Sequence, residues 1–457
     1  IQGSRGRGTI IGNTDLNKVV LGRFLAGPQH IRNVLMPDAI PGLKNRPQTH
    51  PSQGERSGST ATPAGSETGS KPVRLASIDA LRGFDMFWII GGGALVQAVI
   101  KLFADPLPAL IDQQMKHVPW EGFTAWDLIM PLFLFLAGTS MPFSFARRLE
   151  TGQSKARLYA KVLQRVAVLW ILGMIAQGRL LDFDLSKLRL FSNTLQAIAV
   201  GYLIAAIALI HLSRWGQLVL TAILLATFWA VMLCVPFGGN PAGLMDEKVN
   251  LALYIDQIIL GRFCDPKTTY AWILPGLGNG ATVLLGAMAG HLLRSTWSAG
   301  MKFLWLLLVG LLCLLLGWAM AGGPVEMLSR TSLQETAGAW LQRWSDIRFP
   351  IIKHLWTSSM VLWAAGWSYL LLALFFLVID VWGLRRWAMP FTVIGMNAIL
   401  AYMLTHPFNV GNVSAQYVAG LAKHLDRGGP TLTAAASFAV VWGILYYLYR
   451  NRHYLRV

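Results

Sequence analysis

Charged residues are scarce in this sequence. Only 13% of its 457 residues are Asp, Glu, Lys or Arg, whereas 54% are hydrophobic, and ordinary soluble domains carry roughly a quarter of charged residues. A water-soluble fold has no place for so much apolar surface, so the composition excludes a soluble globular protein. The net charge of +17 would suggest nucleic acid binding in a soluble chain, but here the charges lie between apolar segments, as loop charges do.

Cysteines and common catalytic motifs are also few. The three cysteines, Cys234, Cys264 and Cys313, are far apart and lack C-x-x-C spacing, so neither a zinc site nor a disulfide framework is predicted. The sequence contains no G-x-x-x-x-G-K-[ST] phosphate loop, no H-E-x-x-H zinc motif and no G-x-S-x-G nucleophile elbow. These absences argue against ATP-driven transport and standard hydrolase chemistry, and we expect no metal cofactor.

The chain divides by composition into a polar tail and an apolar domain. Residues 1–73 are rich in Gly, Ser, Pro and Thr without a sustained apolar period, so we interpret them as a tail that is disordered or depends on how the protein was produced. Residues 74–457 contain ten apolar segments near the length of about 20 residues that crosses a bilayer. These segments are 84–103, 126–146, 162–178, 194–211, 217–236, 274–293, 303–321, 357–379, 390–406 and 432–449. We therefore predict an all-α, polytopic membrane bundle of about ten transmembrane helices.

The charges between these segments predict the orientation of the bundle. Short cytoplasmic loops are enriched in Lys and Arg, and the connection after the second span and the C-terminus carry such residues, whereas the opposite connections mix them with acids. The positive residues are Arg147, Arg148, Lys155, Arg157, Lys161, Arg450, Arg452 and Arg456. Both termini are therefore predicted to be cytoplasmic, and the longer segments 104–125, 237–273 and 322–356 to lie outside, where a substrate would be received.

His117 and Asp127 are candidates for chemistry at the start of the second span. An imidazole exchanges protons near neutral pH or acts as a nucleophile, although a loop histidine taken alone is more often merely solvated. Asp127 closes the run Thr124-Ala125-Trp126-Asp127, which matches a helix capping box before an apolar stretch. Capping explains this carboxylate most simply, and the same position would let it orient a nearby imidazole.

Other polar residues stand where apolar ones would be expected. Arg82 enters the first span with Asp79 and Asp85 on the same helical face, either as an anchor with local ion pairs or as a site for an anionic ligand. Snorkelling toward water would explain Lys353 at the outer entry of the eighth span. Unpaired polar groups are costly in lipid, so the polar residues within spans are predicted to face the bundle interior. They are Asn193, Gln196, Asn279, Asn397 and His406.

Three long stretches resemble one family of membrane enzymes. They are RLASIDALRGFDMFWIIGG (74–92), HVPWEGFTAWDLIMPLFLFLAGTSMPFS (117–144) and KHLWTSSMVLWAAGWSYLLLALFFLVIDVWGLRRWAMPFTVIGMNAILAYM (353–403). The chain looks like the bacterial relatives of heparan-alpha-glucosaminide N-acetyltransferase, and the resemblance covers about residues 74–450. It implies a transmembrane acyltransferase domain that moves an acetyl group from cytoplasmic acetyl-CoA, as co-substrate, to an amino sugar or glycan on the extracytoplasmic side.

The resemblance also implies roles for individual residues. His117 stands in the family's H-x-P-W motif and would be the catalytic residue, either as general base or as the carrier of a transient acetyl group, with Asp127 holding its ring. Where the human family member has an asparagine before a glycine run, this chain reads IIGGGALVQ, so Asn397 or Asn193 would supply the amide. The remaining predicted site residues are Arg82, Asp79, Asp85 and Asn397 for acetyl-CoA, and Trp120, Glu121 and Lys353 for the acceptor.

The expected setting follows from the same resemblance. We expect the protein to be integral to a membrane, the bacterial inner membrane, with the lipid bilayer, acetyl-CoA and the acceptor as its partners, no nucleic acid, and a possible homodimer. A small-solute transporter or channel with a polar bundle interior is the alternative, because intramembrane Asn and His residues fit both functions. The absence of an obvious inverted repeat favours the enzyme.

Overall fold

The computed structural model describes residues 75–455, with gaps at 151, 178–179, 181–183, 186, 266 and 324–346. The tail predicted at 1–73, most of the third predicted outside segment and Arg456 lie outside the described residues. The described part of the chain is all-α: its only strand-like features are isolated bridge pairs. The predicted fold class is therefore confirmed.

The helices follow one another with short connections. The first part of the described chain contains α2 (Ala76–Phe87), η1 (Trp88–Gly92), α3 (Gly93–Phe103), α4 (Ala109–Gln114), η2 (Ala125–Leu128), α5 (Ile129–Glu150), α6 (Lys155–Ala176), α7 (Thr194–His211), α8 (Arg214–Cys234), α9 (Leu251–Leu260) and η4 (Gly261–Phe263). The second part contains α10 (Gly276–Arg294), α11 (Ala299–Met320), α14 (Ser358–Phe375), η5 (Phe376–Val381), α15 (Met389–Met396), α16 (Ala398–Thr405), α17 (Val410–Ala422), η6 (Asp426–Gly428) and α18 (Gly429–Arg450).

Eight helical stretches in the described residues are long and apolar enough to cross a membrane. They are Ala76–Phe103, Ala125–Ala146, Lys155–Ala176, Thr194–His211, Arg214–Cys234, Ala299–Met320, Ser358–Val381 and Asp426–Arg450. The other two predicted spans are also helical: α10 is a helix of 19 residues, and the segment 390–406 is divided at Asn397 into α15 and α16. The protein is an integral membrane protein, and the count of ten spans stays a prediction.

Local sequence explains where several helices begin. Ser and Asn side chains accept a hydrogen bond from a backbone N–H of the first turn, and this satisfies donors that the helix itself leaves unpaired. Such caps stand before α6, α7, α8, α9 and α11, at Ser154, Asn193, Ser213, Asn250 and Ser298. Within the first span the chain turns at Gly91, whose φ of 111° is readily adopted only by glycine.

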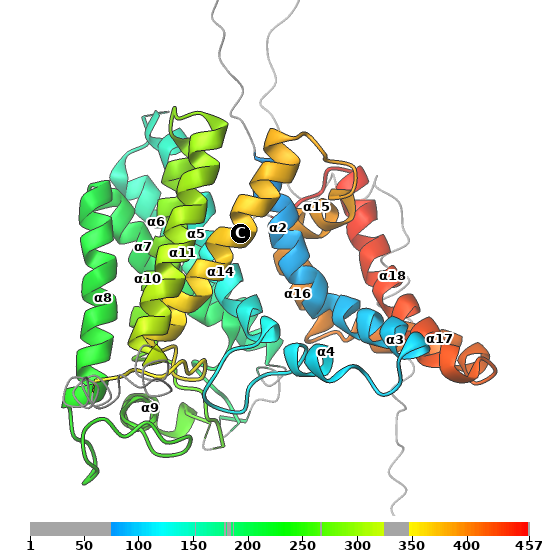
Figure 1. Ribbon diagram of the computed structural model, residues 1–457, viewed down its shortest axis with the longest axis horizontal. Coiled ribbons are helices and arrows are strands. Elements are labelled where there is room, and N and C mark those ends of the chain that lie inside the picture. Colours follow the sequence, from blue (N-terminus) through cyan, green and yellow to red (C-terminus); the bar gives the residue numbers. More distant parts are fainter. Residues whose placement is uncertain are drawn as a thin grey trace, which may run out of the picture. The chain divides into compact units, whose positions relative to one another are not determined.

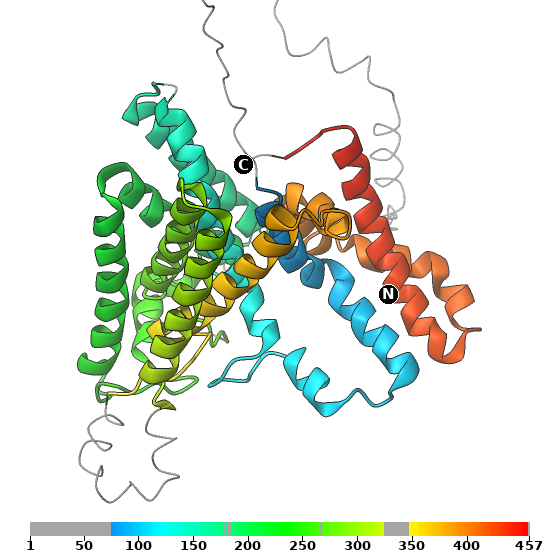
Figure 2. The ribbon, with the colours of Figure 1, turned by 45° about the horizontal axis from the view of Figure 1, so that its top comes forward.

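The long helices pack in two groups, which Figure 1 and Figure 2 show. In the first group α10 packs against α5, α7 and α8, α6 lies along α7, and α11 runs along α14. In the second group α15 lies along α2, and α17 and α18 form a hairpin that contacts α3. Helix α2 also contacts α5 and α14, so it joins the two groups.

The crossing of α2 and α15 depends on two glycines. A Cβ atom on Gly395 would lie 1.9 Å from the carbonyl oxygen of Asp79, and one on Gly83 would lie 1.6 Å from the carbonyl oxygen of Phe391. Small residues let helix backbones approach closely in a membrane, where packing rather than water exclusion holds helices together. The start of α2 is thereby held against α15.

Two connections meet at the end of the bundle that is distant from this crossing. The loop before η2 pairs with the segment before α14, because Glu121 forms an antiparallel bridge with Ile352 and the N–H of Gly122 donates to the carbonyl of Ile351 at 2.9 Å. This short pairing joins segments more than 200 residues apart in the sequence. It places Lys353 beside the loop that carries His117.

Candidate active site

The turn that starts α5 holds the Asp127 carboxylate in a fixed position. Thr124 and Asp127 form a capping box, as the sequence predicted. The backbone N–H and the hydroxyl oxygen of Thr124 lie 3.2 and 2.9 Å from Oδ2 of Asp127, and the N–H of Val118 donates to the same oxygen at 3.3 Å. The Asp127 side chain is 2% exposed. Because these donors engage Oδ2, the second oxygen, Oδ1, is left for other partners.

His117 is the first partner of Oδ1. Its Nδ1 lies 2.7 Å from Oδ1 of Asp127. A carboxylate only accepts hydrogen bonds, so the proton of this bond belongs to Nδ1, and Nε2 of the neutral ring carries the lone pair. The imidazole is half exposed. Asp127 thus both caps α5 and fixes the tautomer in which Nε2 is able to accept a proton or attack a carbonyl.

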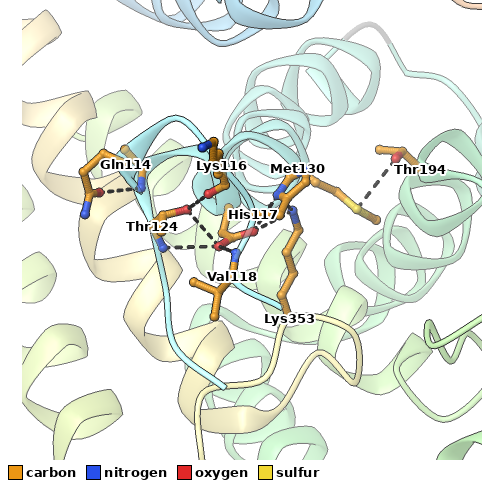
Figure 3. A network of polar contacts seen from close by, with 10 residues as sticks. Gln114, Lys116, His117, Val118, Thr124, Met130, Thr194 and Lys353 are labelled. Atoms are coloured by element: carbon orange, nitrogen blue, oxygen red, sulfur yellow. Dashed lines mark hydrogen bonds and ion pairs between the residues drawn. The ribbon is translucent and has the colours of Figure 1, made fainter. Parts of the chain in front are cut away.

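Lys353 is the second partner of Oδ1. Its Nζ lies 3.1 Å from Oδ1 of Asp127 and 3.1 Å from Nδ1 of His117, and Figure 3 shows the side chains of Lys353 and His117 directed toward one another. The lysine side chain is 9% exposed, so snorkelling toward water does not explain its position. Burial lowers the pKa of Lys353, and the Asp127 carboxylate offsets part of this effect. The ion pair compensates two charges that would each be costly to bury alone.

A cavity of about 460 Å³ opens beside this triad. It is lined by residues from both helix groups and from the connections before η2, α7, α10 and α14. The lining residues are Met86, Trp88, Ile89, His117, Trp126, Ile129, Met130, Phe133, Ser192, Asn193, Thr194, Leu195, Ile198, Tyr270, Trp272, Lys353, Tyr402 and His406. His117 and Lys353 are thus in contact with a space large enough for part of a small-molecule ligand.

The sequence predicted two polar residues of this lining by their position within apolar spans. Asn193 donates from Nδ2 to the hydroxyl of Tyr402 at 3.2 Å, and the ring of His406 stacks on that of Tyr402 at 3.9 Å between centroids. Asn193 caps α7 of the first helix group, and Tyr402 lies on α16, which contacts α2 and α18 of the second group. Their hydrogen bond therefore joins the two groups across the cavity.

Tyr270 and Trp272 were not identified from the sequence. The only signal was an aromatic pair inside the predicted outside segment 237–273. The structure holds them through Asp256 of α9, whose Oδ2 and Oδ1 accept hydrogen bonds from the N–H groups of Trp272 and Ile273 at 2.7 and 2.9 Å. Asp256 is 0% exposed, and burial raises its pKa to about 6 although the two backbone donors act in the opposite direction.

Arg82 lies toward the other end of the bundle. Its Nη1 is 3.3 Å from Oδ1 of Asp79 and its Nη2 donates to Oγ of Ser140 on α5 at 2.6 Å. Ser140 follows Asp127 by 13 residues, which corresponds to about 20 Å of helix. Met86, one turn after Arg82, lines the cavity, so the cavity approaches the level of Arg82 from the side of His117.

Three other predicted site residues, Asp85, Asn397 and Trp120, have different environments. Asp85 is 1% exposed, and its carboxylate has no hydrogen-bond partner in the described part of the chain. Asn397 donates to the carbonyl of His453 and accepts from the N–H of Leu455. Trp120 donates from Nε1 to the carbonyl of Met245 at 3.0 Å.

The structure therefore separates the predicted residues into clusters. His117, Asp127 and Lys353 come together, and Glu121 is exposed in the same loop, 3.9 Å from the Arg348 guanidinium. Asp79, Arg82 and Asp85 share the first half of α2. Asn397 lies apart from the cavity lining. The binding and catalytic roles assigned to all of them stay predictions.

Comparison with known proteins places the chain near one group of enzymes. No protein-family model matches it. It is 23% identical over 384 residues to the heparan-alpha-glucosaminide N-acetyltransferase of Homo sapiens, covering 73% of this chain and 52% of the relative. It is 26% identical over 342 residues to the enzyme of the same name from Mus musculus, covering 63% and 48%. The chain spans about half the length of the curated relatives it matches, and the matches confirm the distant relationship that the sequence predicted.

Proposed function

Starting from this distant relationship, we propose that the protein is a membrane acetyltransferase. It moves an acetyl group from acetyl-CoA on the cytoplasmic side to the amino group of an amino sugar or glycan on the extracytoplasmic side. The observation that carries the proposal is the His117 imidazole, whose Nδ1 is held by buried Asp127 while Nε2 has no hydrogen-bond partner among the described residues. This ring borders a cavity that both helix groups line.

One route uses Nε2 of His117 as a general base. The acceptor amine attacks the thioester carbonyl while Nε2 takes one of its protons. The new C–N bond forms, the C–S bond breaks, and the CoA thiolate leaves and takes up a proton, so the products are the amide and free CoA. The Asp127 carboxylate stabilises the imidazolium that forms, at 2.7 Å from Nδ1.

The other route uses Nε2 as a nucleophile. It attacks the thioester first, the C–S bond breaks, and CoA leaves as the thiolate, which takes up a proton from water. The acetyl group stays on Nε2 until the acceptor amine displaces it and releases a proton. The two routes differ in one measurable species, because only the second labels His117 when the protein meets radiolabelled acetyl-CoA without an acceptor. In both routes Asp127 keeps the ring in the required orientation.

The donor is expected at the Arg82 end of the bundle. CoA is strongly anionic, and a guanidinium suits its phosphate groups; Asp79, Asp85 and Asn397 would shape this region. The separation of about 20 Å between the two ends requires the pantetheine arm to extend along the cavity toward His117. Trp120, Glu121 and Lys353 are proposed to contact the acceptor. The proposed setting is the bacterial inner membrane, with the protein as a homodimer.

The test measures thiol release from acetyl-CoA by purified protein in detergent, with and without glucosamine. We expect His117→Ala to abolish glucosamine-stimulated release while CoA binding stays within a factor of about two, because the ring lies far from the CoA phosphates. Arg82→Gln should instead raise KM for acetyl-CoA. Full activity of His117→Ala would contradict the catalytic role. A transporter would show solute uptake into proteoliposomes that needs no acetyl-CoA.

A further inference from the structure

Two aromatic residues of the loop before α10, Tyr270 and Trp272, line the cavity. The rings of Tyr270 and Trp272 are nearly parallel, with an interplanar angle of 27° and centroids 6.0 Å apart. Both residues line the same cavity as His117 and Lys353. We call Tyr270 and Trp272 the aromatic wall.

Hydrogen bonds and ring contacts fix the position of the aromatic wall. Asp256 accepts the N–H groups of residues 272 and 273, and the N–H of Ala271 donates to the carbonyl of His354 at 3.1 Å. The His354 ring packs on Tyr270 with centroids 3.9 Å apart, and Phe191 packs on Trp272 at 5.4 Å. Burying a carboxylate is costly unless donors compensate it, so Asp256 and its two donors specify one position for this loop.

His354 connects the wall to the triad, because it follows Lys353 directly in the chain. Burial lowers the pKa of His354 to about 4, with Lys353 acting in the same direction, so the ring under Tyr270 is neutral at physiological pH. Burial and the charge of Asp127 raise the pKa of Tyr270 to about 12, so its phenol stays protonated. Tyr270 and His354 are therefore uncharged beside the ion pair of Asp127 and Lys353.

We infer that the aromatic wall binds the flat face of the acceptor's pyranose ring and thereby gives cyclic amino sugars an advantage over linear amines. The inference rests on the proposed function and names the acceptor subsite of that same cavity. One face of a pyranose exposes C–H groups, and these are attracted to the electron-rich face of an indole or phenol ring. An amine on the stacked sugar would lie beside His117, whereas a linear amino alcohol has no flat face to stack.

The experiment compares two acceptors, glucosamine and ethanolamine, by their kcat/KM in the thiol-release assay. Trp272→Leu and Tyr270→Leu remove an aromatic face, and we expect each to lower the glucosamine-to-ethanolamine ratio by about three- to tenfold, the size of one lost aromatic contact. Trp272→Phe and Tyr270→Phe keep a face and should keep the ratio within about twofold. Trp367→Leu, which changes an exposed tryptophan on α14, is the matched control and should leave the ratio unchanged.

Two further measurements distinguish the outcomes. KM for acetyl-CoA should stay at the wild-type value in all four wall variants. A raised KM for acetyl-CoA together with an unchanged glucosamine-to-ethanolamine ratio would overturn the inference, because the wall would then bind the donor. Saturation-transfer NMR of glucosamine on the wild-type protein should show the ring C–H protons of one face closest to the protein. Equal saturation of both faces would also overturn it. An inactive wild-type protein would instead contradict the proposed function.

Discussion

Asp127→Asn tests whether one carboxylate both orients the His117 ring and compensates the charge of buried Lys353. The amide is nearly the same size as the carboxylate, so the cap of α5 keeps an oxygen acceptor for its donors. Two interactions change: Oδ1 no longer carries a charge for His117 Nδ1 at 2.7 Å, and Lys353 Nζ at 3.1 Å loses its counter-charge. The side chain of Lys353 is 9% exposed, so water replaces that partner poorly.

The two changes predict separate magnitudes. A hydrogen bond to a charged group contributes about 1.5–3 kcal/mol, and its loss from the imidazolium of the transition state lowers kcat by about ten- to 150-fold. The loss is larger where the new amide donates to Nδ1, because the proton then moves to Nε2 and removes the attacking lone pair. Leaving a buried lysine without its partner lowers the free energy of unfolding by about 3–5 kcal/mol.

A double variant separates these effects. Asp127→Asn combined with Lys353→Met removes both charges, so no unpaired charge remains buried, and thermal unfolding in detergent should return most of the way to the wild-type temperature. The kcat of the double variant should stay as low as that of Asp127→Asn, because the ring still lacks its carboxylate. Glucosamine-stimulated thiol release supplies the kcat values. A single variant within threefold of wild-type kcat, or a double variant no more stable than the single one, would refute the reasoning.

Two further predictions concern the crossing of α2 with α15 and the carboxylate of Asp256. Gly395→Ala places a Cβ against the carbonyl oxygen of Asp79, so we expect the free energy of unfolding to fall by about 1–3 kcal/mol and the unfolding temperature to drop. The control is Gly443→Ala on α18, where a Cβ meets nothing within 4 Å. Equal effects of the two variants would contradict the close crossing of α2 and α15. Asp256 titrates near pH 6 in the folded protein, above its ordinary value, so its contribution to stability is complete below that ordinary value and decreases, by up to about 3 kcal/mol, as pH rises through 6. Unfolding measured from pH 4.5 to 7.5 should show this slope in the wild type and lose it in Asp256→Asn, and an unchanged slope in the variant would assign the titration to another group.

The spans could be predicted from the sequence because lipid imposes a length and a composition on each helix. Eight of the ten predicted segments meet those requirements in the structure. The glycines and Asn279 of α10 reduce its mean hydropathy, so hydropathy alone does not identify it as a span. Its packing against α5, α7 and α8 shows that it belongs to the bundle. The division of segment 390–406 at Asn397 was not predicted, because an asparagine within an apolar run has no fixed effect on the backbone until its partners are known.

The site could be predicted only where its residues are neighbours in sequence. His117 and Asp127 are ten residues apart, and the capping box at Thr124 already fixed one of them to a helix start. Lys353 was assigned to the acceptor but not to Asp127, because their contact depends on the bridge between Glu121 and Ile352. The positions of Tyr270 and Trp272 depend on hydrogen bonds from their loop to Asp256 and His354, and such contacts have no periodic signal in the sequence.

The division between α15 and α16 has a practical consequence for producing this protein. The side-chain amide of Asn397 donates to the carbonyl of His453 and accepts from the N–H of Leu455. The segment after α18 therefore stabilises the junction between α15 and α16. A version shortened at Arg450 would leave a 1% exposed amide with its two partners deleted, deep inside protein or lipid. Affinity tags and fluorescent fusions attached directly after residue 455 would therefore disturb the junction of α15 and α16.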